Sequence, residues 1–122
     1  MNLEIQEHNT MANRARAAIC RYLEIHGCNI IDRDFDGLLV FEDGDDLAFA
    51  TVAMTVDGFF GKKLAISGEQ FEQVVCKFFE VYDKHFENIL DKHIRYDIIE
   101  LRVIKDHAGV IRHSPNIEFK EE

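Results

Sequence analysis

The stretch that decides the fold is DGLLVFEDGDDLAFATVAM, from Asp36 to Met54. Two apolar, β-prone runs, Leu38 to Phe41 and Leu47 to Val52, flank an Asp43-Gly44 pair. Asp-Gly favours the positive backbone dihedrals of a tight hairpin turn. The stretch therefore predicts two antiparallel strands joined at that turn.

The regions on either side of the hairpin predict two helices and three more strands. Upstream, apolar residues at helical spacing predict a helix from Met11 to His26, and Cys28 to Phe35 has the pattern of a strand. Downstream, Ser67-x-x-Gln70 has the form of a capping box that opens a long, one-sided helix. Runs rich in β-branched residues, from His93 to Ile104 and from Val110 to His113, predict the last two strands. We therefore expect an α/β fold in the order α-β-β-β-α-β-β, a mixed sheet with helices packed on it.

The composition indicates one globular domain. The chain has 122 residues, 47% of them hydrophobic, and a single proline. We expect residues 1–10, which are polar, to fray and residues 11–122 to form the domain. The three cysteines form no CxxC pair, and no secretory or membrane-spanning segment is recognisable. These features predict a soluble, cytoplasmic protein with reduced thiols and no membrane partner.

The net charge of the chain disfavours a nucleic-acid partner. It is −9, from 14 Lys and Arg against 23 Asp and Glu. A protein that binds nucleic acid needs cations to displace condensed counterions. Lys62 and Lys63 are the only adjacent basic residues and are the candidates for such contacts. A nucleic-acid surface would require them to share one face with Arg14, Arg16 and Arg21.

Two acidic clusters resemble metal-binding patterns weakly. Asp32 to Gly37 has the acid spacing of a calcium-binding EF-hand loop, but Gly27 ends the preceding helix too early and the following residues lack helical periodicity. The acids from Glu42 to Asp46 crowd a turn, where side chains splay outward instead of converging on one ion. We expect both clusters to be solvated, and the residues predict no metal or other cofactor.

Five separated stretches share the pattern of one family. They are AAICRYLEIHGCNIIDRDF (17–35), GDDLAFATVAM (44–54), Phe60-Gly61, RYDIIEL (95–101) and IRHSPNIEF (111–119). Together they resemble the YraN-type family of small bacterial proteins, over residues 13–119. The resemblance implies the fold of restriction endonucleases and archaeal Holliday-junction resolvases.

The resemblance also implies where an active site would lie. In this fold an acid on the first hairpin strand and a Glu-x-Lys on the next bind one or two metal ions, and a glutamate is usual on the opening helix. The corresponding positions of this chain hold Leu38, Thr51, Ala53 and Arg16. Loss of the carboxylates removes the charge that would hold Mg²⁺ against its hydration shell. Asp36, two residues from Leu38 and on the same strand face, is the candidate for a displaced acid.

Three functions remain as hypotheses. The first is a nuclease-fold protein that has lost metal-dependent phosphodiesterase activity, has no catalytic residues and serves as a binding or scaffolding module. The second is a DNA or RNA nuclease that uses Asp36 and Asp34 as displaced acids, with Mg²⁺ or Mn²⁺ as cofactor. The third is a protein-interaction domain, including a homodimer, that acts through its acidic surface or an exposed sheet edge.

Overall fold

The computed structural model describes residues 3–56, 66–82, 93–105 and 108–119. Its elements follow the predicted order, which is confirmed. They are α1 (Leu3–Ile25), β1 (Asn29–Phe35), β2 (Leu38–Asp43), β3 (Asp46–Val56), α2 (Gly68–Tyr82), β4 (His93–Lys105) and β5 (Ala108–Ser114).

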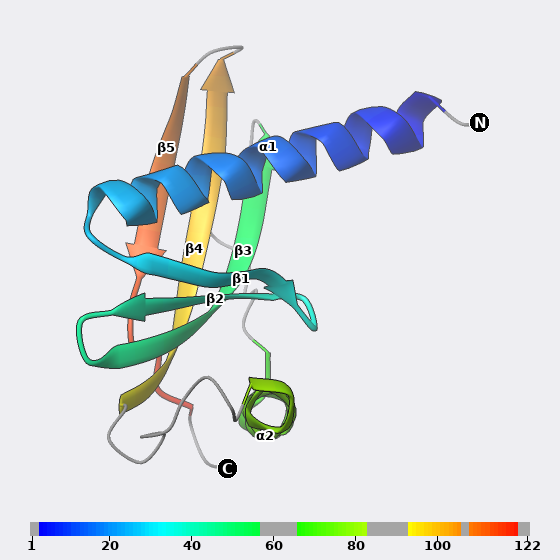
Figure 1. Cartoon of the computed structure of the whole chain (residues 1–122). Helices are drawn as coiled ribbons and strands as arrows, with labels where there is room; N and C mark the ends of the chain where they lie inside the picture. Colours follow the sequence, from blue (N-terminus) through cyan, green and yellow to red (C-terminus); the bar gives the residue numbers. More distant parts are fainter. Residues whose placement is uncertain (1–2, 57–65, 83–92, 106–107, 120–122) are drawn as a thin grey trace.

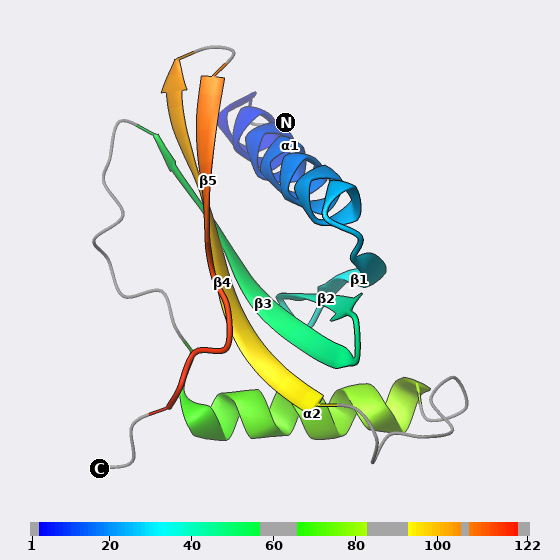
Figure 2. The same ribbon diagram turned by 90° about the vertical axis from the view of Figure 1, so that its left-hand side faces the viewer.

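The strands form one mixed sheet of five strands in the order β1-β2-β3-β4-β5. Neighbouring strands are antiparallel except β3 and β4, which run parallel. A parallel pair needs a long crossover, and α2 lies within this one. Helix α1 crosses one face of the sheet, and α2 lies at its lower end on the other side (Figures 1 and 2). The α/β class and the mixed sheet are therefore as predicted.

Both faces of β2 and β3 are buried from Leu38 to Phe41 and from Leu47 to Ala50. Leu39 and Phe41 pack against α1, whereas Leu38 and Val40 pack in the cluster that includes α2. Alternate residues of a strand point to opposite faces, so a strand between two helical layers is apolar throughout. This explains why Leu38 to Phe41 is an unbroken apolar run.

The hairpin turn lies one residue later than predicted. Asp43 pairs with Asp46, so the two loop residues are Gly44 and Asp45, and not Asp43 and Gly44. Gly44 takes a φ of +61° at the first loop position. Glycine at that position is typical of the type II′ turn, which matches the twist of the flanking strands.

A second Asp-Gly hairpin joins β1 to β2, at the acidic stretch that resembled a calcium loop. Phe35 pairs with Leu38, and Asp36 and Gly37 between them have φ angles of +53° and +90°. Two positive φ angles are the signature of a type I′ turn. Strands flank this loop on both sides, so the two helices that an EF-hand requires are not there.

Helix α1 begins earlier than predicted, at Leu3 instead of Met11. Residues 3–10, which were expected to fray, therefore lie in the helix. It contains no glycine or proline, so no strong helix breaker stops the helix from extending toward the N-terminus. Neither described helix is long and apolar enough to cross a membrane.

The capping box at the start of α2 is confirmed. The Ser67 hydroxyl accepts a hydrogen bond from the Gln70 backbone N–H at 3.1 Å, and Gln70 Oε1 accepts one from the Ser67 N–H at 3.0 Å. Two amide groups that the first turn leaves without intrahelical partners are thus satisfied. The cap fixes where α2 starts, beside the middle of β3.

Candidate functional site

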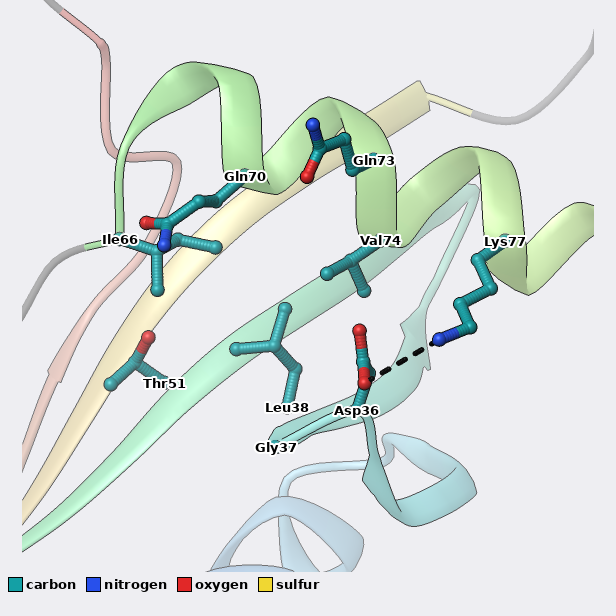
Figure 3. Close-up of a pocket in the computed structure, with 9 residues that line it drawn as sticks. All are labelled: Asp36, Gly37, Leu38, Thr51, Ile66, Gln70, Gln73, Val74 and Lys77. Carbon is teal, nitrogen blue, oxygen red and sulfur yellow. Dashed lines mark ion pairs between the residues drawn. The ribbon is translucent and has the colours of Figure 1, made fainter.

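A pocket of about 420 Å³ opens between α2 and the two hairpins. Figure 3 shows the lining residues, which come from the β1–β2 turn, from β2 and β3, and from α2 and the residue before its cap. They are Asp36, Gly37, Leu38, Thr51, Ile66, Gln70, Gln73, Val74 and Lys77. The pocket combines an apolar base with amide, hydroxyl and charged groups.

Leu38 and Thr51 meet at this pocket from adjacent strands. Leu39 of β2 pairs with Ala50 of β3. Because these strands are antiparallel, the same register places Leu38 opposite Thr51. Leu38 is only 4% exposed and packs in the same cluster as Val74. In the family that the sequence resembles, the first acid and the glutamate would stand at these two positions, and both positions reach one cavity.

The Thr51 hydroxyl is already engaged. It forms a short hydrogen bond with the hydroxyl of Tyr96, a β4 residue that is 1% exposed. The same tyrosine oxygen accepts a hydrogen bond from the Ile66 backbone N–H at 3.2 Å. The buried Tyr96 hydroxyl therefore links Thr51 and Ile66, two residues that line the pocket.

An ion pair lies at one end of the pocket. Lys77 Nζ of α2 is 3.8 Å from Asp36 Oδ1, and their side chains are 61% and 48% exposed (Figure 3). Exposed pairs of this kind contribute little to stability, because water screens them. Lys77 nevertheless places a positive charge next to Asp36, which is the one carboxylate among the lining residues.

The donor set of the pocket does not fit a divalent metal. Mg²⁺ and Mn²⁺ sites of nucleases use several carboxylates that converge on the ion. Here Asp36 faces a lysine, and the Gln70 oxygen is occupied by the helix cap. Among the described residues no group of three or more histidine, cysteine, aspartate or glutamate side chains is placed to hold a metal.

Arg16 and Ala53 do not line the pocket. Arg16 of α1 donates hydrogen bonds to the backbone carbonyls of Arg33 and Gly37, and so supports the β1–β2 turn from the other side. Ala53 pairs with Glu100 of β4, two residues beyond Thr51 on the same face of β3. Of the four positions that the resemblance singles out, the structure therefore brings together two.

Asp34 does not join Asp36. Its Oδ1 accepts a hydrogen bond from the Gly37 N–H at 3.0 Å, which stabilises the turn. This use of an aspartate, which satisfies a backbone amide two or three residues on, is frequent in turns. Only Asp36 of the proposed displaced acids lines the cavity.

The basic residues do not form one described surface. Lys62 and Lys63 lie outside the described residues. On α1, Arg14 and Arg21 are exposed and seven positions apart, hence on one face, whereas Arg16 points about 140–160° away and binds the β1–β2 turn. The shared face that nucleic-acid binding would require does not include Arg16.

Sequence reasoning missed a buried charge network around Arg95 and Asp97. Asp97 of β4 is fully buried and accepts hydrogen bonds from Arg95 Nε at 3.1 Å, from His113 Nε2 at 2.8 Å and from the Asn116 N–H at 2.9 Å. Burial by itself raises the pKa of Asp97, but these hydrogen bonds outweigh it and hold the pKa below its ordinary value. The signal available was two opposite charges two residues apart, on one face of β4.

The acids of the β2–β3 turn belong to the same network. Arg95 donates to Asp46 Oδ2 at 2.8 Å and to Asp43 Oδ2 at 3.0 Å. The hydrogen bond from Arg95 lowers the pKa of Asp46. The expectation that these acids are only solvated is therefore wrong for Asp43 and Asp46, because the guanidinium of Arg95 lies between β4 and the turn.

Comparison with protein-family models and with curated proteins found no match.

Proposed function

We propose that this chain is a YraN-type protein with the restriction-endonuclease-like fold that has lost metal-dependent phosphodiesterase activity and acts as a binding or scaffolding module. The observation that carries the proposal is the meeting of Leu38 and Thr51 at one pocket. An acid and a glutamate at these two positions would converge on one point, as a metal site requires. An alkyl group and an engaged hydroxyl cannot supply that charge.

The fold is compatible with the proposal. A mixed sheet in the order β1-β2-β3-β4-β5, with α2 on the crossover between the parallel strands, follows the element order that the residue patterns predict. A fold alone does not determine function, so the proposed function is argued from the residues that line the pocket.

The pocket suits a ligand that binds without a metal ion. Leu38, Val74 and Ile66 provide apolar surface, and the carboxamide of Gln73 lies at the rim. Small-molecule sites combine such apolar walls with a few polar groups that fix orientation. We infer that the retained role is recognition rather than chemistry.

The direct test is a titration of the purified chain with Mn²⁺ by calorimetry, together with thermal melts in the same buffer. We expect no heat of binding and no rise in the melting temperature, because one carboxylate opposed by Lys77 cannot hold the ion. Incubation with branched or single-stranded DNA and Mn²⁺ should leave the DNA intact. Cleavage that disappears in Asp36→Ala would establish the displaced-acid nuclease instead.

A second candidate function is protein interaction through the β5 edge. Strand β5 is last in the sheet order. Val110 on β5 is 47% exposed, and Ile104 on the neighbouring strand β4 is 50% exposed. Open edges and exposed apolar residues favour strand pairing with another chain. Sedimentation would show self-association, and Val110→Lys should abolish it if the edge is the contact.

A further inference from the structure

The segment after β5 returns to the helix that forms one wall of the pocket. From Ser114 the chain runs down beside the sheet to the start of α2 (Figure 2). We name residues 115–119 the C-terminal strap. At its end the Phe119 ring lies 5.3 Å from the Phe71 ring of α2, between ring centroids. The strap thus spans from β5 to α2 without entering either element.

Two successive backbone amides anchor the strap to β4. The Asn116 N–H donates to Asp97 Oδ1 at 2.9 Å, and the Ile117 N–H donates to the Tyr96 carbonyl at 2.7 Å. Asn116 has a φ of +53°, a region that asparagine tolerates better than most residues. The buried carboxylate therefore holds the strap in a specific backbone conformation.

Tyr96 lies between the strap and the pocket. The Phe119 ring stacks on the Tyr96 ring, with centroids 5.2 Å apart and planes inclined by 25°. At the far end of the same side chain, the Tyr96 hydroxyl binds Thr51 and the Ile66 N–H, both part of the pocket lining. The Tyr96 ring thus contacts the C-terminal strap, and the Tyr96 hydroxyl forms hydrogen bonds with two residues that line the pocket.

We propose that the C-terminal strap controls the shape of the pocket through Tyr96, so that docking of the strap and binding in the pocket are coupled. Release of the strap removes the aromatic ring that stacks on Tyr96. The Tyr96 ring then keeps the tilted contact with the Phe71 ring, 5.4 Å between centroids, but loses its stacked partner, so its hydroxyl is held less firmly against Thr51 and Ile66. Coupling between two sites is reciprocal, so a ligand that orders these lining residues also stabilises the docked strap. The inference rests on the proposed function only in treating the pocket as a binding site.

Amide hydrogen exchange at Ile66 tests the first half of this coupling. Phe119→Ala should raise the exchange rate of the Ile66 N–H at least tenfold, because its acceptor is the Tyr96 hydroxyl. The matched control is Phe79→Ala, which removes the same ring from the same core cluster. The Phe79 ring contacts the Phe78 ring, whereas the rings that contact Tyr96 in the described part of the chain are those of Phe71 and Phe119. The control should leave Ile66 protected while it raises exchange near the end of α2.

The second half of the coupling predicts that a change in the pocket alters the docking of the C-terminal strap. Thr51→Val removes the hydroxyl that binds Tyr96 and should raise exchange of the Asn116 and Ile117 amides at least threefold. Thr55→Val is the matched control, since it makes the same change on the same face of β3. The Thr55 hydroxyl is buried and finds no hydrogen-bond partner in the described part of the chain. It should leave both strap amides unchanged.

A double variant separates coupling from general loss of packing. In Tyr96→Phe the Ile66 amide has already lost its acceptor, so adding Phe119→Ala should raise its exchange no further. If Phe119→Ala fails to fold, Phe119→Leu preserves the bulk and removes the stacked ring. Unchanged Ile66 exchange in the strap variants, or an equal rise in Phe79→Ala, would overturn the proposal. Hydrogen exchange is measured without metal, so its result does not depend on the Mn²⁺ titration. Heat in that titration would contradict the proposed function, whereas unchanged Ile66 exchange would contradict only the coupling.

Discussion

His113 Nε2 lies 2.8 Å from Asp97 Oδ2, and this hydrogen bond ties the end of β5 to β4 inside the protein. The carboxylate is fully buried and also accepts two hydrogen bonds from Arg95, which is itself 9% exposed. A buried carboxylate is tolerated only when its oxygens are satisfied in this way. The Asp97 carboxylate therefore connects β4, the end of β5 and the segment that follows β5.

Removal of this carboxylate should destabilise the fold strongly. Asp97→Ala leaves the Arg95 guanidinium buried without its main partner and releases the Asn116 N–H. We expect the free energy of unfolding to fall by about 3 to 5 kcal/mol, as for one partner of a buried pair. Urea unfolding followed by circular dichroism measures it. The control Asp45→Ala, at an exposed turn position, should stay within about 0.5 kcal/mol of the parent.

The same group predicts how stability depends on pH. The pKa of Asp97 in the folded chain lies below its ordinary value of 3.8, so the ionised form is favoured by folding. The contribution is fully present above the unfolded pKa and is lost as the pH falls through the folded pKa. We expect the free energy of unfolding to decrease progressively below pH 3.8.

Urea midpoints between pH 7 and pH 2 would check this dependence. Asp97→Asn should show a shallower decrease below pH 4, since the titrating group is gone. Some slope should remain, because the pKa of Asp46 is also lowered by its hydrogen bond from Arg95. A variant slope equal to that of the parent would show that other groups dominate acid unfolding.

The capping box should contribute measurably to α2. Ser67→Ala removes the acceptor of the Gln70 N–H, and we expect a loss of about 1 kcal/mol in the free energy of unfolding. Gln73→Ala, an exposed position of the same helix, serves as the control and should be close to neutral. Both are measured by thermal or urea unfolding. An unchanged midpoint for Ser67→Ala would mean that packing alone holds the start of α2.

Introducing the metal-binding residues of the family that the sequence resembles should create metal binding in this pocket. In the triple variant Leu38→Asp, Thr51→Glu and Ala53→Lys, two carboxylates would face one pocket. We expect this variant to be less stable than the parent without metal, because position 38 is 4% exposed. Mn²⁺ should then raise its stability, by about 2.7 kcal/mol at a hundred times the dissociation constant.

The matched control for the restored site carries Leu38→Asn, Thr51→Gln and Ala53→Lys, which keep the shapes and remove the negative charge. It should show no heat with Mn²⁺ in calorimetry and no metal-dependent shift in melting temperature. If the acidic variant also shows none, Leu38 and Thr51 do not correspond to the family's metal-binding positions.

Local patterns accounted for the elements and for the start of α2. The apolar runs on both sides of Gly44 and the Ser67-x-x-Gln70 pattern are contained in a few consecutive residues, and each corresponds to an observed strand or cap. The Asp36-Gly37 turn carried an equally local signal. Asp-Gly favours a two-residue hairpin loop here as it does at the next turn, and both residues adopt the positive φ angles of such a loop.

The contacts of the candidate site were beyond such patterns. Arg95 reaches Asp43 across 52 positions of sequence, and Thr51 reaches Tyr96 across 45. Such pairs depend on strand register and on which face of the sheet each helix covers, and both are set by the packing of the whole domain. For the same reason the acids of the β2–β3 turn were expected in solvent, whereas two of them bind a nearly buried arginine.

The sequence by itself determined the order of helices and strands and the residue types at the four positions where the family's chemistry would lie. Only the tertiary structure decided that Leu38 and Thr51 share one pocket, that Arg16 and Ala53 stay outside its lining, and that Tyr96 joins this pocket to the end of the chain. The physical reason is range. Helix caps, turns and apolar periodicity act between residues a few positions apart, whereas a pocket forms where distant segments pack together and exclude water from the groups between them.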